Sequence, residues 1–401
     1  MTWMGKAQQI RRQNMKVNAV AGKLFSMLRE DGLRCCILKG QGNALMYPNP
    51  YSRTPGDIDV WIDASRERIM EYTQKKFELG DDIRLQHLET SLDGVPVELH
   101  FFPCSMNNIL YHARLQKWFR RNADLQCSNV VSLPDGAGDI AIPTTAFNVV
   151  YQLTHLYHHF FDEGIGMRQI IDYYYVVCDF YKVYQNSSKI TPSLFTIKEG
   201  PTSHPDPLTL RGEGGNRPTR CSEPLRSKDG GPSKVSPDCA GWDRLGMSGA
   251  SKVSPDCAGW DRRDAIGDIA SDASVSSAFT TDSSASTALD VVQRELKYLG
   301  LWKFAGAVMY VLHEALGLSR EKMIVPIDEK RGKLLLAEIL NGGNFGKHFT
   351  KYAGFTHQSM GKKYFLKIWR NMHFVRYYPA EALCEPLFRT WHFFWRLKYK
   401  K

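Results

Sequence analysis

The chain has 401 residues, of which 43% are hydrophobic and 23% are charged, and its formal net charge is +10. This composition is typical of a soluble globular protein with two or three domains. The nine cysteines include no CxxC pair, which excludes a zinc-ribbon signature or a disulfide framework and favours a cytoplasmic protein. No run of 18 apolar residues predicts a membrane span, and residues 1–16 lack the apolar core of a signal peptide. The positive charge either favours anionic partners, such as nucleotides or nucleic acid, or belongs to scattered surface Lys and Arg.

The first 140 residues alternate between helical and strand patterns, which predicts a small mixed α/β domain. An amphipathic helix is expected over Val17–Asp31, and Ser65 is expected to cap a second helix. Between these helices, Lys39-Gly40-Gln41-Gly42 forms a turn into a short helix that ends before Pro48. The strands are expected at Leu33–Leu38, Asp57–Ile62, His87–Ser91 and Val95–Phe102, and Asp93-Gly94 predicts a hairpin between the last two.

Two of these strands carry acidic residues opposite an apolar face. In the Asp57–Ile62 strand, the alternation places Asp57, Asp59 and Trp61 on the face opposite Ile58 and its apolar neighbours. Glu98 and His100 occupy the equivalent face of the later strand. Carboxylates brought this close need a cation between them, and Mg²⁺ with substrate phosphates as further ligands suits them. If the two strands are neighbours, Glu98 joins Asp57 and Asp59 in one site for metal-assisted phosphoryl or nucleotidyl transfer.

These residues resemble a family of bacterial nucleotidyltransferases within the DNA-polymerase-β-like superfamily. The resemblance lies in Leu38-Lys39-Gly40, Tyr47-Pro48, Arg53 with Asp57-Ile58-Asp59, and Val97-Glu98-Leu99-His100. Lys39-Gly40 stands where other branches have Gly-Ser or Gly-Gly at the start of the active-site helix. The resemblance implies that Asp57 and Asp59 are metal ligands, that Glu98 is the third carboxylate, and that Mg²⁺ or Mn²⁺ and a nucleoside triphosphate are required.

Three further residues complete the predicted site. Backbone N–H groups near Gly40 are expected to hold the triphosphate at a helix N-terminus, and Lys39 adds positive charge. Arg53 is either a phosphate contact or an anchor for the strand that carries Asp57. Trp61 shares the acidic face and would either stack on a base or pack at the rim.

The following segment, residues 141–184, is predicted to begin a helical domain. His155, His158 and His159 share one helical face and form either a metal site, a polar face toward the active-site cleft, or ordinary surface. In the next helix, Met167–Lys182, Arg168 and Asp172 are four residues apart. An intrahelical ion pair is the favoured interpretation of this spacing, and the resemblance raises contact of Arg168 with a substrate phosphate as the alternative.

Residues 185–287 differ from the rest of the chain because Ser, Thr, Gly, Pro and Asp dominate and hydrophobic periodicity disappears. A twelve-residue segment occurs twice, at Ser233–Arg244 and Ser251–Arg262. Such a composition predicts a disordered insertion without a catalytic role. Helical periodicity returns over residues 288–401, which form the second part of the helical domain. Its C-terminus is basic and contains the aromatic residues Trp391, Phe393, Phe394, Trp395 and Tyr399. This pattern favours a terminal helix that packs its aromatic residues on that domain over a nucleic-acid or membrane surface.

The predicted fold is therefore α+β, with a nucleotidyltransferase domain, a helical domain and a disordered insertion. The predicted function is Mg²⁺-dependent transfer of a nucleoside monophosphate to an unidentified hydroxyl acceptor, with release of pyrophosphate. Transfer of AMP onto a protein, as in toxin–antitoxin members of the superfamily, is the alternative within the same fold. A non-catalytic nucleotide-binding module and nucleic-acid binding are the other classes, and the absence of a Walker or kinase signature argues against a kinase.

Overall fold

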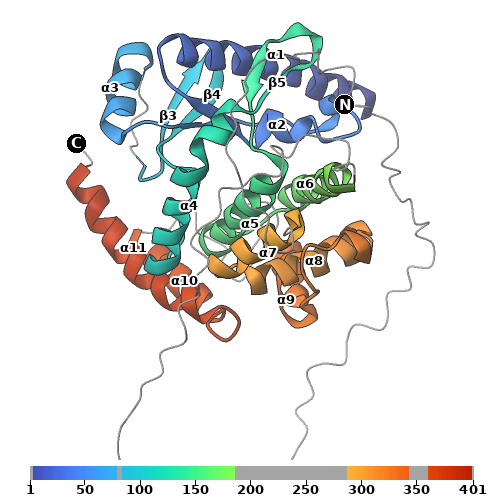
Figure 1. Ribbon diagram of the computed structural model, residues 1–401. Coiled ribbons are helices and arrows are strands. Elements are labelled where there is room, and N and C mark those ends of the chain that lie inside the picture. The colour runs from blue at the N-terminus through green and yellow to red at the C-terminus, as the bar shows by residue number, and fades with distance from the viewer. Residues whose placement is uncertain (1–2, 79–83, 186–286, 343–359, 400–401) are drawn as a thin grey trace, which may run out of the picture. The chain divides into compact units, whose positions relative to one another are not determined.

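The computed structural model describes residues 3–78, 84–185, 287–342 and 360–399 (Figure 1). The predicted disorder of the insertion lies outside these residues, apart from its first and last positions. All described residues belong to one compact unit. The helices of its first half are α1 (Trp3–Glu30), α2 (Gly40–Ala44), α3 (Arg66–Lys76), α4 (Ile109–Ser128), α5 (Thr145–Asp162) and α6 (Met167–Gln185). Those of its second half are α7 (Ala288–Tyr298), α8 (Trp302–Leu316), α9 (Glu329–Gly342), α10 (Met360–Met372) and α11 (Pro379–Tyr399).

A four-stranded mixed sheet lies in the N-terminal part of the unit. Its strands β1 (Cys35–Leu38), β2 (Ile58–Ile62), β3 (His87–Leu92) and β4 (Val95–His100) follow the order β1-β2-β4-β3. β1 is antiparallel to β2, β2 is parallel to β4, and β4 is antiparallel to β3. The predicted neighbourhood of the two acidic strands is therefore confirmed. The α+β fold class is also confirmed, and the domain boundaries at residues 140 and 288 stay predictions.

The strict alternation in β2 separates the core from the site. Ile58, Val60 and Ile62 join the apolar cluster formed with α1, together with the corresponding side chains of β1 and β4. On the other face, Trp61 stacks on Phe147 of α5 with their rings 6.4 Å apart. Figure 1 shows α1 along one side of the sheet and α5 on the other. β2 and β4 thus contribute apolar residues to one layer and acidic residues to the space under α5.

The β3–β4 hairpin sets the register of the polar face. Its loop is the predicted Asp93-Gly94 pair, and both residues have positive φ, as a tight two-residue turn requires. This turn pairs Leu92 with Val95 and, further along, His87 with His100. The parallel β2–β4 pairing places Asp59 directly beside Glu98. The hairpin turn thereby places His87 opposite His100, next to the paired Asp59 and Glu98.

A second, two-stranded ribbon of β5 (Val130–Ser132) and β6 (Asp139–Ala141) packs against α1 at Gly22. A Cβ at this position would lie 2.2 Å from the backbone oxygen of Ala137, which a rigid turn cannot relieve. We expect Gly22→Ala to lower the free energy of unfolding by about 1–3 kcal/mol through overpacking, although alanine favours helix. Urea denaturation measures the change. Gly317→Ala serves as a comparison, because a Cβ there meets no atom within 4 Å and only its left-handed φ of 69° opposes the substitution.

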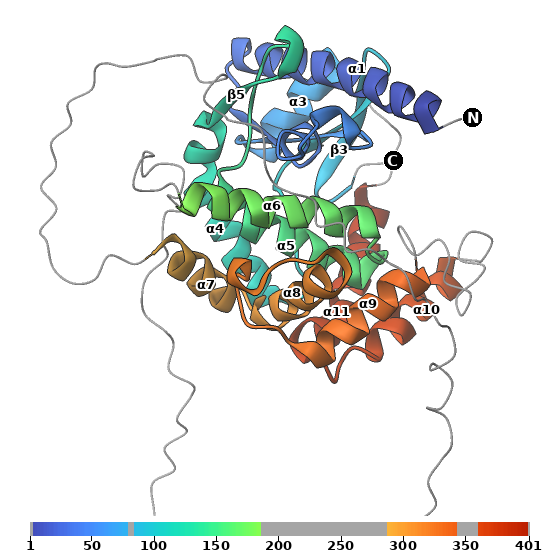
Figure 2. The ribbon, with the colours of Figure 1, turned by 90° about the vertical axis from the view of Figure 1, so that its right-hand side faces the viewer.

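The helices of the C-terminal half attach to the end of α5 through ion pairs. Asp162 accepts hydrogen bonds from Lys367 of α10 at 3.0 Å and Arg389 of α11 at 3.2 Å. Burial opposes the charge of Asp162, but these two cations lower its pKa well below the usual range. Figure 2 shows α7 to α10 on the side of α5 and α6 away from the sheet. None of the helices in the described ranges is long and apolar enough to cross a membrane.

The predicted terminal helix is present as α11, and its aromatic residues pack only in part. Its buried face consists of Glu381, Ala382 and Glu385. Trp395 is half-buried, with the Arg66 guanidinium 5.3 Å from its ring, whereas Trp391, Phe393 and Phe394 are exposed. The helix turns a narrow side toward α4, where Glu381 accepts hydrogen bonds from the backbone N–H groups of the α4 N-terminal region. Trp391, Phe393 and Phe394 fall outside that narrow contact and for this reason remain accessible, and the side chain of Tyr399 lies outside the described residues.

Candidate active site

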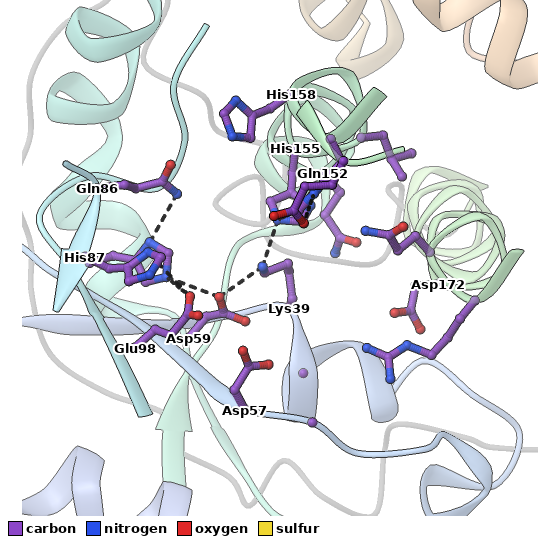
Figure 3. Close-up of a pocket in the computed structure, with 18 of the residues that line it drawn as sticks. Lys39, Asp57, Asp59, Gln86, His87, Glu98, Gln152, His155, His158 and Asp172 are labelled. Carbon is purple, nitrogen blue, oxygen red and sulfur yellow. Dashed lines mark hydrogen bonds and ion pairs between the residues drawn. The ribbon is translucent and has the colours of Figure 1, made fainter. Parts of the chain in front are cut away.

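A polar cavity of about 280 Å³ lies between the acidic face of the sheet and the helices α5 and α6 (Figure 3). The sheet side contributes Asp57, Asp59 and Glu98 with Lys39, and the helical side contributes histidines and Arg168. All six residues predicted for the site line this cavity: Lys39, Gly40, Arg53, Asp57, Asp59 and Glu98. Segments separated by more than a hundred residues along the chain therefore meet in one concave, hydrophilic space.

Asp57, Asp59 and Glu98 converge on one point. Each offers a carboxylate oxygen, and the three oxygens lie within 4.8 Å of one another. The surrounding protein and the other two carboxylates raise the pKa of Asp57 above its ordinary value. Burial opposes the charge of Asp59, but Lys39 and His100 lower its pKa below the usual range. The opposite pKa shifts of Asp57 and Asp59 indicate that negative charge is concentrated here and that Lys39 neutralises only part of it.

Lys39 is the cation already present among these acids. Its Nζ lies 3.0 Å from Asp59 Oδ1 and 2.9 Å from His155 Nε2, as Figure 3 shows. Burial opposes its charge, but Asp59 and the other carboxylates raise the pKa of Lys39 above its ordinary value. Its backbone has a φ of 53° and a ψ of −140°, a conformation favourable mainly to glycine. The ammonium group is thus held charged at the entrance to α2.

Gly40 allows the predicted tight turn, with a φ of 45°. A Cβ on this residue would lie 3.7 Å from the backbone oxygen of Asp57, so the turn passes close to the start of β2. Gly42 does not form the turn as expected. It lies inside α2, where a Cβ would come within 3.0 Å of Ile142, so its role is close packing.

His100 connects two of the acids. Its Nε2 lies 3.1 Å from Asp59 Oδ1 and 3.2 Å from Glu98 Oε2. Burial opposes protonation of the ring, but hydrogen bonding to these carboxylates raises the pKa of His100. The same contact lowers the pKa of Glu98, although burial acts in the opposite direction. His100 therefore keeps both carboxylates ionised and fixes the orientation of their oxygens.

The three histidines of α5 face the cavity, in agreement with the polar-face interpretation. Burial lowers the pKa of His155 well below its usual value, and lowers the pKa of His158 to about 4. His159 Nε2 lies 3.1 Å from His155 Nε2. Among the described residues, no group of three metal-ligating side chains includes them, so the proposed helical metal site finds no support. The three rings form a polar wall of the cavity opposite the acids.

Arg53 joins the sheet domain to α6. Its guanidinium donates from Nε and Nη2 to the two carboxylate oxygens of Asp172, both at 2.9 Å, and both side chains are buried. Tyr47 also donates to Asp172, at 2.6 Å. Of the two roles considered for Arg53, this geometry corresponds to the anchor.

The expected ion pair within α6 is absent because Arg53 and Tyr47 occupy Asp172. Arg168 points instead into the cavity, where its Nε is buried and has no hydrogen-bond partner in the described part of the chain. Its Nη2 would lie 3.9 Å from a Cβ on Gly56, the residue before Asp57. The four-residue spacing of Arg168 and Asp172 correctly predicts that they share one face of a helix. It does not predict that Asp172 binds Arg53, which is distant in sequence.

Comparison with known proteins decides the family. A family model described as an uncharacterised nucleotidyltransferase matches residues 1–184, which include every residue of the acidic cluster and both Arg53 and Arg168. Residues 1–184 belong to this nucleotidyltransferase family. The predicted recognition and the assignment as a transferase are thereby confirmed, and nucleotidyl transfer is the general activity of such proteins.

Other comparisons add little to the nucleotidyltransferase assignment. The structure of an antigenic nucleotidyltransferase-like protein from Paracoccidioides brasiliensis is 17% identical and covers 40% of this chain and 75% of that one, with a TM-score of 0.29. A TM-score this low gives the likeness no weight for fold or function. No functionally curated protein matches the chain.

Trp61 of the nucleotidyltransferase domain is not available to a base. It is buried between Phe147 and Phe119, with ring separations of 6.4 Å and 6.0 Å. The packing interpretation is therefore the one that the structure supports. This aromatic stack fixes α5 over the sheet and sets the depth of the cavity.

Sequence reasoning missed His87, Gln86 and Gln152, which also line the cavity. Gln152 donates to Asn43 of α2 at 2.6 Å and helps to hold α2 against α5. His87 could have been predicted, since a two-residue loop at Asp93-Gly94 places it opposite His100 in the hairpin. No sequence signal identified Gln86, which precedes β3, or Gln152, which lies in α5, because single glutamines are common in such positions.

The carboxylates fit a divalent ion of the kind that the nucleotidyltransferase family implies. Their three oxygens are close enough to share one ion, and Asp57 has no cationic side-chain partner within salt-bridge distance in the described residues. Oxygen ligands of this type suit Mg²⁺ and Mn²⁺, which also bind substrate phosphates. Asp57, Asp59 and Glu98 are the residues that would hold such an ion.

Proposed function

We propose that the protein transfers a nucleoside monophosphate from a nucleoside triphosphate to a hydroxyl acceptor, using Mg²⁺ or Mn²⁺ held by Asp57, Asp59 and Glu98. The observation that carries this proposal is the convergence of three carboxylates from β2 and β4 within a cavity that also contains Lys39 and Arg168. A divalent ion bound there neutralises charge on the phosphates and on the attacking oxygen. A binding module without turnover would not need all three acids.

In the proposed reaction the acceptor oxygen attacks the α-phosphorus. The bond between that phosphorus and the oxygen leading to the β-phosphate breaks, and pyrophosphate leaves with the electron pair. Glu98 receives the acceptor's proton, because its lowered pKa keeps it ionised and His100 orients it. Lys39 and the backbone N–H groups at Gly40 bind triphosphate oxygens on the α2 side of the cavity.

The direct test is calorimetric titration of the full chain with each nucleoside triphosphate, with and without Mg²⁺. We expect one triphosphate to bind in a metal-dependent manner, and the Asp57→Ala/Asp59→Ala variant to lose that dependence. Binding that is equal with and without metal would leave only a scaffold function. Failure of every triphosphate to bind would contradict the transferase proposal.

Arg168 is proposed to bind a phosphate of the nucleotide, because its buried Nε has no partner and faces the cavity. We expect Arg168→Gln to weaken triphosphate binding about 10- to 100-fold, the loss typical of a hydrogen bond to a charged group. Arg168→Lys should recover part of the affinity, since it keeps the charge but not the planar donor set. Calorimetry measures the change, and Lys182→Gln, on the exposed end of the same helix, is the matched control.

The chemical class of the acceptor separates two versions of this function. A protein acceptor retains the label from an α-³²P triphosphate in acid-precipitable material, whereas a small hydroxyl acceptor leaves it in the supernatant. His155 and His158, whose pKa values burial lowers, offer hydrogen bonds rather than charge to the acceptor. This favours a polar, uncharged hydroxyl compound, and label in the precipitate would support the alternative of transfer to a protein.

A further inference from the structure

The cavity contains a second group of metal-ligating side chains, which consists of His87, Glu98 and His100. Its ligand atoms lie within 4.8 Å of one another, as those of the three carboxylates do, and Glu98 belongs to both groups. Figure 3 shows His87 beside Glu98, on the opposite side of the cavity from Asp172. The two groups are therefore adjacent, and they differ in chemistry because one offers only oxygen and the other includes imidazole nitrogen.

His87 is the residue of this group that the transferase mechanism does not use. It is only 8% exposed, and neither ring nitrogen has a hydrogen-bond partner in the described part of the protein. A buried polar group without a partner is costly, which indicates that a ligand completes it. An imidazole nitrogen that makes no hydrogen bond has a lone pair to donate when the ring is neutral.

The distances correspond to ligands of one ion. Two ligands bound at tetrahedral or octahedral angles to a first-row metal lie roughly 3–3.5 Å apart. Glu98 Oε2 is 3.5 Å from His87 Nδ1 and 3.2 Å from His100 Nε2. The other ring nitrogen of His100, Nδ1, lies 3.3 Å from Gln86 Nε2, and Gln86 also donates to the Pro103 carbonyl at 2.9 Å. The Gln86 amide therefore donates to Nδ1 and fixes the orientation of the ring, and binding of an ion at Nε2 requires that nitrogen to release its proton.

We propose that His87, Glu98 and His100 bind a transition-metal ion of the Mn²⁺, Co²⁺ and Zn²⁺ class, adjacent to the oxygen-only site and bridged to it by Glu98. Imidazole ligands favour these ions, whereas Mg²⁺ requires oxygen ligands and keeps its waters. This site goes beyond the proposed transferase function, since it binds its ion without nucleotide. Occupancy of this site by a second metal would change the charge environment of Glu98, the residue proposed to receive the acceptor's proton.

The test uses the metal-free full chain, prepared with EDTA, and Co²⁺ as the probe in the presence of excess Mg²⁺ and without nucleotide. We expect one saturable Co²⁺ site with the visible absorption of a nitrogen-ligated ion. His87→Gln should weaken Co²⁺ binding at least tenfold and shift that absorption. His158→Gln, which changes a cavity histidine outside the group, and Asp57→Asn, which changes only the oxygen site, should both leave Co²⁺ affinity within about twofold of wild type.

Equal Co²⁺ affinity in wild type and His87→Gln would overturn the proposal, as would displacement of Co²⁺ by Mg²⁺ alone. If His87→Gln does not fold, pulsed EPR of Mn²⁺ bound to the wild-type chain decides, because a ligating imidazole gives a ¹⁴N coupling and an all-oxygen site gives none. These measurements contain no nucleotide, so their failure leaves the transferase proposal standing. Conversely, failure of triphosphate binding leaves the Co²⁺ result standing.

Discussion

Asp57→Asn should lower Mg²⁺-dependent pyrophosphate release about a thousandfold while the protein stays fully folded. Asp57 would hold the divalent ion that stabilises charge on the phosphates by several kcal/mol, and each 1.4 kcal/mol corresponds to a factor of ten in rate. Stability should be unchanged or slightly increased, because Asp57 has no ion-pair partner among the described residues and its raised pKa reflects desolvation by burial followed by repulsion from Asp59 and Glu98. Steady-state kinetics and thermal unfolding measure the two effects separately.

Asp93→Asn is the matched control for this substitution. Asp93 forms an exposed ion pair with Lys23 in the β3–β4 turn, and asparagine tolerates the same positive φ. The control should retain full activity and lose well under 1 kcal/mol. Equal activity of Asp57→Asn and Asp93→Asn would exclude the three-carboxylate site as the catalytic centre.

Arg53→Ala should be among the most destabilising single substitutions in the described chain, with a loss of about 3–5 kcal/mol in the free energy of unfolding. It leaves the Asp172 carboxylate buried against Tyr47 without its bidentate cation. Because Arg53 lies four residues before Asp57, we also expect weaker nucleotide binding in the variant. Chemical denaturation measures the stability, and calorimetry measures the binding.

Two comparisons test this explanation. The double variant Arg53→Met/Asp172→Leu removes both charges and should recover much of the stability, since an apolar pair needs no compensating ion. Arg331→Ala breaks an ion pair with Asp328 within three residues, where both side chains are partly exposed, and should cost about 1 kcal/mol or less. Equal losses from Arg53→Ala and Arg331→Ala would contradict the special importance of burial.

Much of the fold follows from local patterns that have a physical cause. The alternation in β2 identified both faces, and the Asp93-Gly94 turn fixed the hairpin and hence the position of His87 opposite His100. Ser65 caps α3 as expected, by accepting a hydrogen bond from the Arg68 N–H. In each case a single short-range rule, such as strand periodicity, positive φ or helix capping, determines the outcome.

The parts that could not be predicted depend on contacts between distant segments. Asp172 looked like the partner of Arg168, but the buried guanidinium of Arg53, 119 residues earlier, binds it instead. The position of Trp61 was similarly ambiguous until Phe147 was seen to stack on it. An acid that pairs with a residue four positions away on its own helix and one that pairs with a distant residue have the same local sequence pattern. Only the structure distinguishes the two cases.

The backbone of Lys39 has a consequence for how this site can change. A residue with a side chain at φ 53° and ψ −140° stores strain of order 1–3 kcal/mol, and glycine would release it. Selection for stability alone would therefore favour glycine at this position. Because the protein has lysine at this position, it retains a strained backbone conformation in a residue that lines the cavity. A more heat-resistant form of this protein would be obtained most directly by giving up the ammonium group on which the site depends.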